Sequence, residues 1–178
     1  KHSRASIVSL SKGFVADDTN VRLLPDVLSA YGKANSVAMG LISGPSFAGE
    51  TARGLPLALV CAMSDGARAT ELAHALRDPA MRMYASEDVI GVSLCGALKN
   101  IFAIAAGISD GLKLGANARA ALVTRGLAEL RRLVEACGGN PDTVSGLAGV
   151  GDVLLTTTGD ASRNRQVGLQ LATGKSLD

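Results

Sequence analysis

The chain has 178 residues, of which 47% are apolar and 19% charged, a composition typical of a soluble globular protein with a buried core. A net charge of +2, three phenylalanines and two tyrosines exclude a basic nucleic-acid arm and an aromatic platform for single strands. No nucleic-acid partner is therefore expected. Glycine is frequent, at 21 residues, which indicates tight backbone approaches in a folded chain.

The cysteines and histidines indicate neither a disulfide framework nor a metal site. Cys61, Cys95 and Cys137 lie in apolar stretches without CxxC spacing, which favours buried, reduced thiols and a cytoplasmic protein. His2 and His74 have no partner at metal-ligand spacing, so no bound metal is expected. The N-terminal residues KHSRASIVSL lack the apolar stretch of a signal peptide.

Strand and helix patterns alternate over the first 86 residues. Short apolar runs predict strands at residues 7–10, 37–42, 57–62 and 81–85. Helical spacing predicts helices at residues 20–31, interrupted early by Pro25, and at residues 67–77. Residues 1–86 are therefore expected to form part of an α/β sheet domain.

Helical patterns dominate from residue 87 onward. Helices are expected at residues 88–108 and 117–137, from residue 141, and near residue 162. The apolar run 92–108 approaches membrane-spanning length, but it carries Lys99 and Asn100 at its centre. This favours a buried helix of a soluble protein, so no transmembrane segment is expected. Residues 87–178 are expected to form an all-α domain.

Lys99 is the first candidate for chemistry. Burying an ammonium without compensation is costly and lowers its pKa, so a lysine in an apolar helix requires a partner or a use. Its neighbours at helical spacing, Cys95, Gly96 and Ala103, are small and leave room for a ligand. The alternative is a lysine whose ammonium reaches the surface from a core helix.

Asp152 closes the segment GLAGVGD at residues 146–152. The spacing GxxGxG reverses the dinucleotide fingerprint GxGxxG and is therefore no evidence for it. On spacing alone, the favoured interpretation is a turn with a helix-capping aspartate.

Three further segments combine element ends with groups that bind anions. The segment TGDASRNR, residues 158–165, pairs a helix start with arginines, although a solvated basic first turn is the alternative. SGPSFAGE, residues 43–50, joins a strand end to a helix start, for which a simple loop is equally common. Lys12 follows the first strand, where open α/β sheets bind ligands.

Together and in this order, these segments resemble the bacterial type of NAD(P)-dependent glycerol-3-phosphate dehydrogenase. The motifs cover nearly the whole chain: SKG (11–13), SGPSFAGE (43–50), ARGLP (52–56), DVIGVSLCGALKNIFAIAAGISDGL (88–112), NARAALVTRGLAEL (117–130), GLAGVGDVLLTTTGDASRNR (146–165) and GKSL (174–177). The central motifs are long and specific.

The resemblance implies an enzyme that interconverts dihydroxyacetone phosphate and sn-glycerol 3-phosphate by hydride transfer with NAD or NADP, in glycerophospholipid precursor synthesis. It implies that residues 1–86 form the C-terminal part of a Rossmann-type nucleotide domain. A helical substrate domain like that of 6-phosphogluconate dehydrogenase would follow at residues 87–178. A homodimer is also possible, because dimers are the commonest assembly.

The resemblance also implies the site residues. Lys99 is similar to the catalytic acid/base, and Lys12 to a lysine that contacts both substrate and cofactor. The other implied substrate contacts are Gly44, Ser46, Lys99, Asp152, Ser162, Arg163 and Asn164. Ala48 and Arg163 are implied cofactor contacts, and Asn100 and Thr156 are supporting candidates.

Two features depart from that family pattern. No GxGxxG occurs in the 178 residues, and the sequence stops soon after GKSL. We therefore expect a fragment holding the last part of the nucleotide domain and the first part of the substrate domain. The preference between NAD and NADP stays open.

Two other functions compete with this hypothesis. One is a related lysine-dependent dehydrogenase of the 6-phosphogluconate or hydroxyisobutyrate type, against which the unbroken GALKN and GDASRNR segments count. The other is a non-catalytic fragment that binds a phosphate metabolite or serves in dimerisation.

Overall fold

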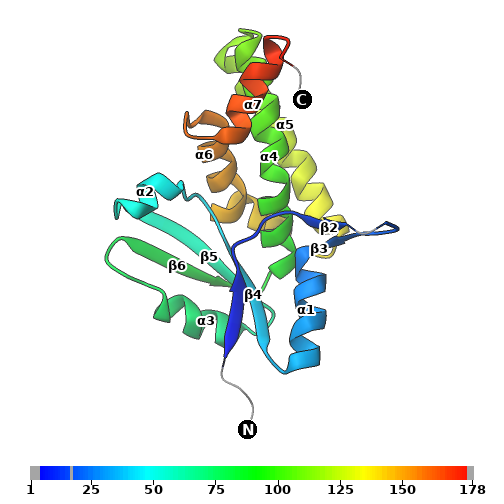
Figure 1. Cartoon of the computed structure of the whole chain (residues 1–178), viewed down its shortest axis with the longest axis vertical. Helices are drawn as coiled ribbons and strands as arrows, with labels where there is room; N and C mark the ends of the chain where they lie inside the picture. Colours follow the sequence, from blue (N-terminus) through cyan, green and yellow to red (C-terminus); the bar gives the residue numbers. More distant parts are fainter. Residues whose placement is uncertain (1–4, 17, 176–178) are drawn as a thin grey trace.

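The computed structural model describes residues 5–16 and 18–175, so His2 lies outside the described residues. A sheet with flanking helices forms one part of the molecule and a stack of helices forms the other (Figure 1). The first part ends with strand β6 (Met81–Ser86), and the second begins with helix α4 (Val89–Gly111). The predicted order, α/β followed by all-α, is confirmed.

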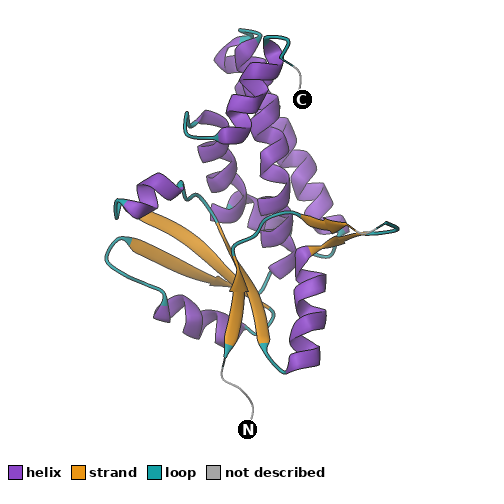
Figure 2. Ribbon diagram, viewed as in Figure 1, coloured by secondary structure: helices purple, strands orange, loops and turns teal. Residues whose placement is uncertain are grey.

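The main sheet has four strands in the order β1-β4-β5-β6, and Figure 2 shows its strands in orange beside the purple helices. Its other strands are β1 (Ser6–Ser9), β4 (Ala38–Ser43) and β5 (Leu57–Met63), and all four lie where strands were predicted. The pairs β1–β4 and β5–β6 are parallel, whereas β4 and β5 are antiparallel. The carboxyl ends of β1 and β4 therefore lie together at one edge.

The segment predicted as a helix at residues 20–31 is divided in the structure. Strands β2 (Phe14–Ala16) and β3 (Val21–Leu23) form a separate antiparallel hairpin, and helix α1 (Leu24–Asn35) begins only afterwards. Pro25 lies in the first turn of α1, where its missing N–H costs no helical hydrogen bond. The prediction was wrong at residues 20–23, because Pro25 marks the start of the helix rather than an interruption.

Two short helices complete the sheet part. Helix α2 (Ala48–Ala52) follows the loop after β4, and α3 (Gly66–Ala75) joins β5 to β6. A core between the sheet and α3 buries Ile42, Leu59, Cys61, Met63, Ala69, Ala73 and Met83. This packing fixes the sheet against α3.

Helix α4 is the centre of the helical part. It contacts α5 (Gly115–Ala136), α6 (Asp152–Thr158) and α7 (Arg163–Ala172). Between α5 and α6 lie the 3-10 helix η1 (Pro141–Ser145) and the π-helix η2 (Leu147–Gly151). By length and composition α4 could cross a membrane, but 44% of its most apolar window is buried inside the protein. Its residues Val92, Leu94 and Cys95 belong to a hydrophobic core.

A second core joins the two parts of the molecule. It packs Leu41 and Ala62 of the sheet against Val92, Leu94 and other residues of α4, α5 and the η segments. The helical part therefore rests directly on the sheet. The groups that follow β1 and β4 are brought close to α4 in this way.

The prediction of buried cysteines is correct for two of the three. Cys61 and Cys95 are fully buried free thiols, and burial raises the pKa of Cys95 to about 12. Cys137 is a free thiol but exposed, so the prediction was wrong there. It caps the C-terminal end of α5, where the helix leaves the core and its apolar neighbours no longer indicate burial.

Candidate active site

The Lys99 ammonium points to a carboxylate rather than to the solvent. Its Nζ lies 2.6 Å from Oδ1 of Asp152, and the lysine side chain is only 16% exposed. The alternative of an ammonium that reaches the surface is therefore excluded. The apolar spacing of α4 buries the stem, and the carboxylate compensates the charge.

Lys12 binds the other oxygen of the same carboxylate. Its Nζ lies 2.7 Å from Oδ2 of Asp152, although the two residues are 140 positions apart. The stem of Lys12 passes over α4 at Gly96, where an added Cβ would lie 3.3 Å from Lys12 Cγ. Glycine at position 96 therefore gives Lys12 the room to reach the carboxylate beside Lys99.

Asp152 is 0% exposed and lies in the first turn of α6. Its side chain does not cap the helix, so the interpretation favoured by the spacing was wrong. The hydroxyl of Thr156 donates to the Asp152 carbonyl one turn away and lies 3.4 Å from its Oδ1. We name Lys12, Lys99 and Asp152 the lysine cluster.

The environment changes the proton affinity of Lys99. Burial lowers its pKa below the usual 10.5; the hydrogen bond and charge of Asp152 oppose this shift, and the positive charge of Lys12 adds to it. The net direction is downward. The ammonium is therefore a stronger acid than a lysine in water, as a proton donor requires.

The start of α7 lies beside the lysine cluster. Asn164 donates from Nδ2 to Oδ1 of Asn100 at 2.7 Å, and Asn100 follows Lys99 on α4. Ser162 caps α7, is 3% exposed, and accepts a hydrogen bond from a backbone N–H of the first turn. Arg163 is exposed and has no ion pair among the described residues. These groups combine hydrogen-bond donors with a free cation.

The loop after β4 lies against the segment that precedes Asp152. An added Cβ at Gly151 would lie 3.6 Å from Pro45. Gly44 is buried with φ +136, and the exposed Ser46 donates to its carbonyl at 3.3 Å. Ala48 is exposed at the start of α2, and the contacts that join the lysine cluster do not include it.

Family models match both parts of this chain. The C-terminal model of NAD-dependent glycerol-3-phosphate dehydrogenase matches residues 88–178, and the N-terminal model of the same family matches residues 1–69. The chain belongs to the NAD-dependent glycerol-3-phosphate dehydrogenase family. The resemblance inferred from the motifs is thereby confirmed.

Individual relatives agree with this assignment. Glycerol-3-phosphate dehydrogenase [NAD(P)+] of Herminiimonas arsenicoxydans is 54% identical over 97% of this chain, and that of Ralstonia nicotianae is 53% identical over 97%. The crystal structure of the Coxiella burnetii enzyme superposes with a TM-score of 0.88 at 47% identity, over 98% of this chain and 52% of that one. The chain spans about half the length of the curated relatives it matches.

Ser43 lies beside the lysine cluster and was not among the residues that the sequence predicted. It is 2% exposed, and its hydroxyl has no hydrogen-bond partner within the described residues. An added Cβ at Gly96 would lie 3.1 Å from its Oγ and 3.3 Å from Lys12 Cγ. The Ser-Gly-Pro sequence at the end of β4 could have indicated Ser43, but only Gly44 and Ser46 of this loop were predicted as substrate contacts.

The carboxyl ends of β1 and β4 fit one side of the nicotinamide cofactor that the family name implies. Lys12 and Gly44 follow these parallel strands, at the place where open α/β sheets bind nucleotides. Gly13 and Gly44 have φ values of +142 and +136, so both turns expose backbone without a side chain. Lys12 places a cation at this edge of the sheet.

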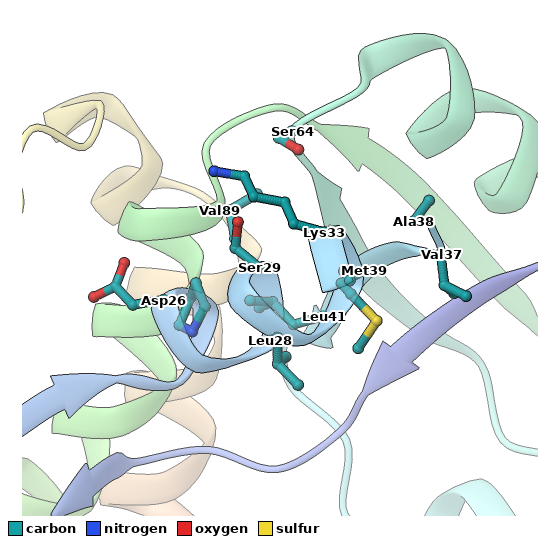
Figure 3. A pocket seen from close by; sticks show the side chains of 13 residues that line it. Asp26, Leu28, Ser29, Lys33, Val37, Ala38, Met39, Leu41, Ser64 and Val89 are labelled. Carbon is teal, nitrogen blue, oxygen red and sulfur yellow. The ribbon is translucent and has the colours of Figure 1, made fainter. Parts of the chain in front are cut away.

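A separate cavity of about 290 Å³ lies between α1, β4 and the start of α4 (Figure 3). Ser29 and Lys33 of α1 and Ser64 after β5 line it. No residue of the lysine cluster is among its lining residues. This cavity is therefore separate from the candidate site at the lysine cluster.

Proposed function

We propose that this chain supplies the substrate site of an enzyme that interconverts dihydroxyacetone phosphate and sn-glycerol 3-phosphate with NAD(H) or NADP(H). Residues 1–86 would be the end of the nucleotide domain and residues 87–178 the substrate domain. The observation that carries the proposal is the buried carboxylate of Asp152, which holds the ammonium groups of Lys12 and Lys99. The family assignment supports the same reaction over the 6-phosphogluconate type.

Lys99 acts as the acid/base in this proposal. A bound reduced nicotinamide would supply the hydride that reduces the carbonyl carbon of the ketone. During reduction of the ketone, the Lys99 Nζ donates a proton to the carbonyl oxygen. During oxidation of the alcohol, it accepts a proton from the hydroxyl. Its lowered pKa makes both directions accessible.

Lys12 and Asp152 set the electrostatics of the reacting oxygen. Two ammonium groups around one carboxylate leave a net positive charge in a part-buried site. This charge stabilises the negative charge that develops on the oxygen. Asp152 also holds both lysines in place, and the Thr156 hydroxyl supports it.

The remaining residues hold the rest of the ligands. Ser162, Arg163 and Asn164 bind the substrate phosphate at the start of α7, where backbone N–H groups and a guanidinium favour an anion. Asn100 orients Asn164. The loop after β4 contributes Gly44 and Ser46 to the substrate, while Ala48, Arg163 and Lys12 contact the cofactor.

Replacing Lys99 tests the proposal. The variants are made in a chain that joins residues 1–178 to the flanking segments of the Herminiimonas relative. Lys99→Ala is expected to lower kcat by about 100- to 10,000-fold, because the proton donor is lost. Lys33→Ala on the exposed face of α1 serves as the control and is expected to retain wild-type kcat.

A near-wild-type kcat for Lys99→Ala would contradict the assigned role. Titration of the chain completed with the Herminiimonas segments, using glycerol 3-phosphate with and without NAD+, addresses the non-catalytic alternative, because the 178 residues alone contain no GxGxxG. A Kd for glycerol 3-phosphate that changes when NAD+ is bound supports the enzyme, and a Kd that NAD+ leaves unchanged supports a metabolite-binding module.

A further inference from the structure

An ion-pair cluster joins three helices beyond the lysine cluster. Arg165 of α7 donates to Oδ2 of Asp110 on α4 from Nη2 at 2.7 Å and from Nε at 3.0 Å. Arg119 of α5 donates from Nη1 to both oxygens of the same carboxylate, at 2.8 and 2.9 Å. The side chains of Asp110 and Arg165 are only 13% and 12% exposed. A largely buried carboxylate thus holds two helices to α4.

Burial raises the pKa of Asp110, but the hydrogen bonds and charges of Arg165 and Arg119 outweigh this and hold the pKa below its usual 3.8. The carboxylate is therefore charged at neutral pH. Hydrogen bonds between charged partners at these distances are the strong ones, and two of them fix the orientation of the Arg165 guanidinium.

Arg165 also connects to the groups assigned to the substrate phosphate. Its backbone N–H donates to Oγ of Ser162 at 3.3 Å. Its neighbour Asn164 is bound to Asn100 of α4. The first turn of α7 is therefore attached to α4 at Asn100, beside Lys99, and again at Asp110, about 15 Å farther along the helix.

The two arginines in the first turn of α7 differ in whether their charge is already compensated. A cation in the first turn of a helix opposes the helix dipole. For Arg165 this is compensated by Asp110 and by Asp160, whose Oδ1 lies 3.1 Å from Nη1. Arg163 is exposed and has no ion pair in the described part of the chain. An anion at this helix start therefore meets Arg163, while Arg165 is already neutralised.

We propose that Asp110 and Arg165 are positioning residues: their ion pair fixes the start of α7 against α4, so that Ser162, Arg163 and Asn164 meet the phosphate while Lys99 meets the reacting oxygen. This rests on the proposed function for the identity of the ligand. The two ends of the substrate would then be held at a distance set by one rigid helix, α4, because both attachments belong to it.

The test compares two arginines that bind the same carboxylate. Arg165→Met removes the attachment of α7, and Arg119→Met removes that of α5 and leaves α7 attached. Arg165→Lys retains the charge and one hydrogen bond. For each 178-residue variant we measure backbone amide exchange at residues 163–166, with strand β5 as the reference for global folding, and the Kd of glycerol 3-phosphate and of inorganic phosphate by titration.

Arg165→Met is expected to raise amide exchange in the first turn of α7 and the Kd of both ligands by about tenfold or more, because hydrogen bonds to a charged group are lost. Arg119→Met is expected to change both by less than about twofold. Arg165→Lys should recover part of the loss. If Arg165→Met also accelerates exchange in β5, the variant has lost global stability. Arg165→Lys and Asp110→Asn, which retain the side-chain size more closely, are then compared with Arg119→Met instead.

Two results would overturn the inference: unchanged exchange in the first turn of α7 when Arg165 is replaced, or equal effects of the Arg165 and Arg119 variants. A wild-type chain that binds no glycerol 3-phosphate, while Arg165→Met still accelerates exchange in this turn only, would instead count against the proposed function. The positioning role of the pair would stand in that case.

Discussion

At the scale of single residues, the site depends on one carboxylate that serves two lysines. Asp152 is completely buried, and the ammonium groups bound to both of its oxygens compensate the cost of removing its charge from water. In the proposed function, the positive charge that remains attracts the anionic substrate. The same carboxylate opposes the effect of burial on Lys99, and thereby tunes the group that we assign as the proton donor.

This balance predicts the pH dependence of the reaction. In the proposed function, ketone reduction requires the protonated form of Lys99, so kcat for reduction is expected to fall as the pH rises through the Lys99 pKa, which lies below 10.5. Asp152 raises that pKa, so in Asp152→Asn the fall is expected at lower pH. The measurement is the pH profile of dihydroxyacetone phosphate reduction in the chain completed with the Herminiimonas segments. A falling limb that stays in place in Asp152→Asn would refute the coupling.

At the scale of the elements, two glycines allow α7 to lie directly on α4. An added Cβ at Gly107 would collide with the carbonyl oxygen of Arg165 and lie 2.9 Å from Cα of Gly168. An added Cβ at Gly168 would collide with the carbonyl of Ile104 in the same way. The backbones therefore touch at the level of Arg165, and the first turn of α7 is held close to α4.

Gly107→Ala is expected to lower the free energy of unfolding by about 1–3 kcal/mol, because the new methyl group overpacks this crossing. This loss of stability is expected even though alanine stabilises an isolated helix by about 1 kcal/mol relative to glycine. Gly49→Ala in α2, where an added Cβ meets no atom within 4 Å, is the matched control and is expected to be neutral or stabilising. Urea denaturation measures both, and equal stability of the two variants would contradict the close approach.

At the scale of the whole molecule, the site is assembled where the sheet part and the helical part meet. Lys12 comes from the loop after β1, whereas Lys99 and Asp152 come from α4 and α6. The core that packs Leu41 and Ala62 against α4 keeps the two parts in contact. A ligand at the lysine cluster therefore stabilises both parts together. The cytoplasmic location and the homodimer stay predictions.

Glycerol 3-phosphate is expected to stabilise the entire 178-residue chain in one cooperative transition. At a concentration of about 100 times Kd, it should add about 2.7 kcal/mol to the free energy of unfolding and raise Tm by about 5–10 °C. Glycerol without the phosphate is the control and should leave Tm nearly unchanged. Thermal unfolding followed by circular dichroism measures both, and equal Tm values with the two ligands would contradict a phosphate-dependent site.

The sequence predicted the main-sheet strands, the long helices, the family and most candidate residues, but neither the β2–β3 hairpin nor Ser43. Apolar spacing reports burial along one helix or strand, so a lysine at residue 99 stood out within an apolar helix. The long motifs from residue 88 to residue 165 predicted the family that the comparisons confirmed. The roles of the individual residues stay predictions.

Only the tertiary structure decided which charges meet. Asp152 lies 53 positions from Lys99 and 140 from Lys12, and local spacing carries no information on such pairs. The same holds for Arg165, which is neutralised by Asp110, 55 positions away. Spacing along the chain shows which face of an element is buried, whereas the packing of α4, α6 and α7 determines the partner of each buried charge.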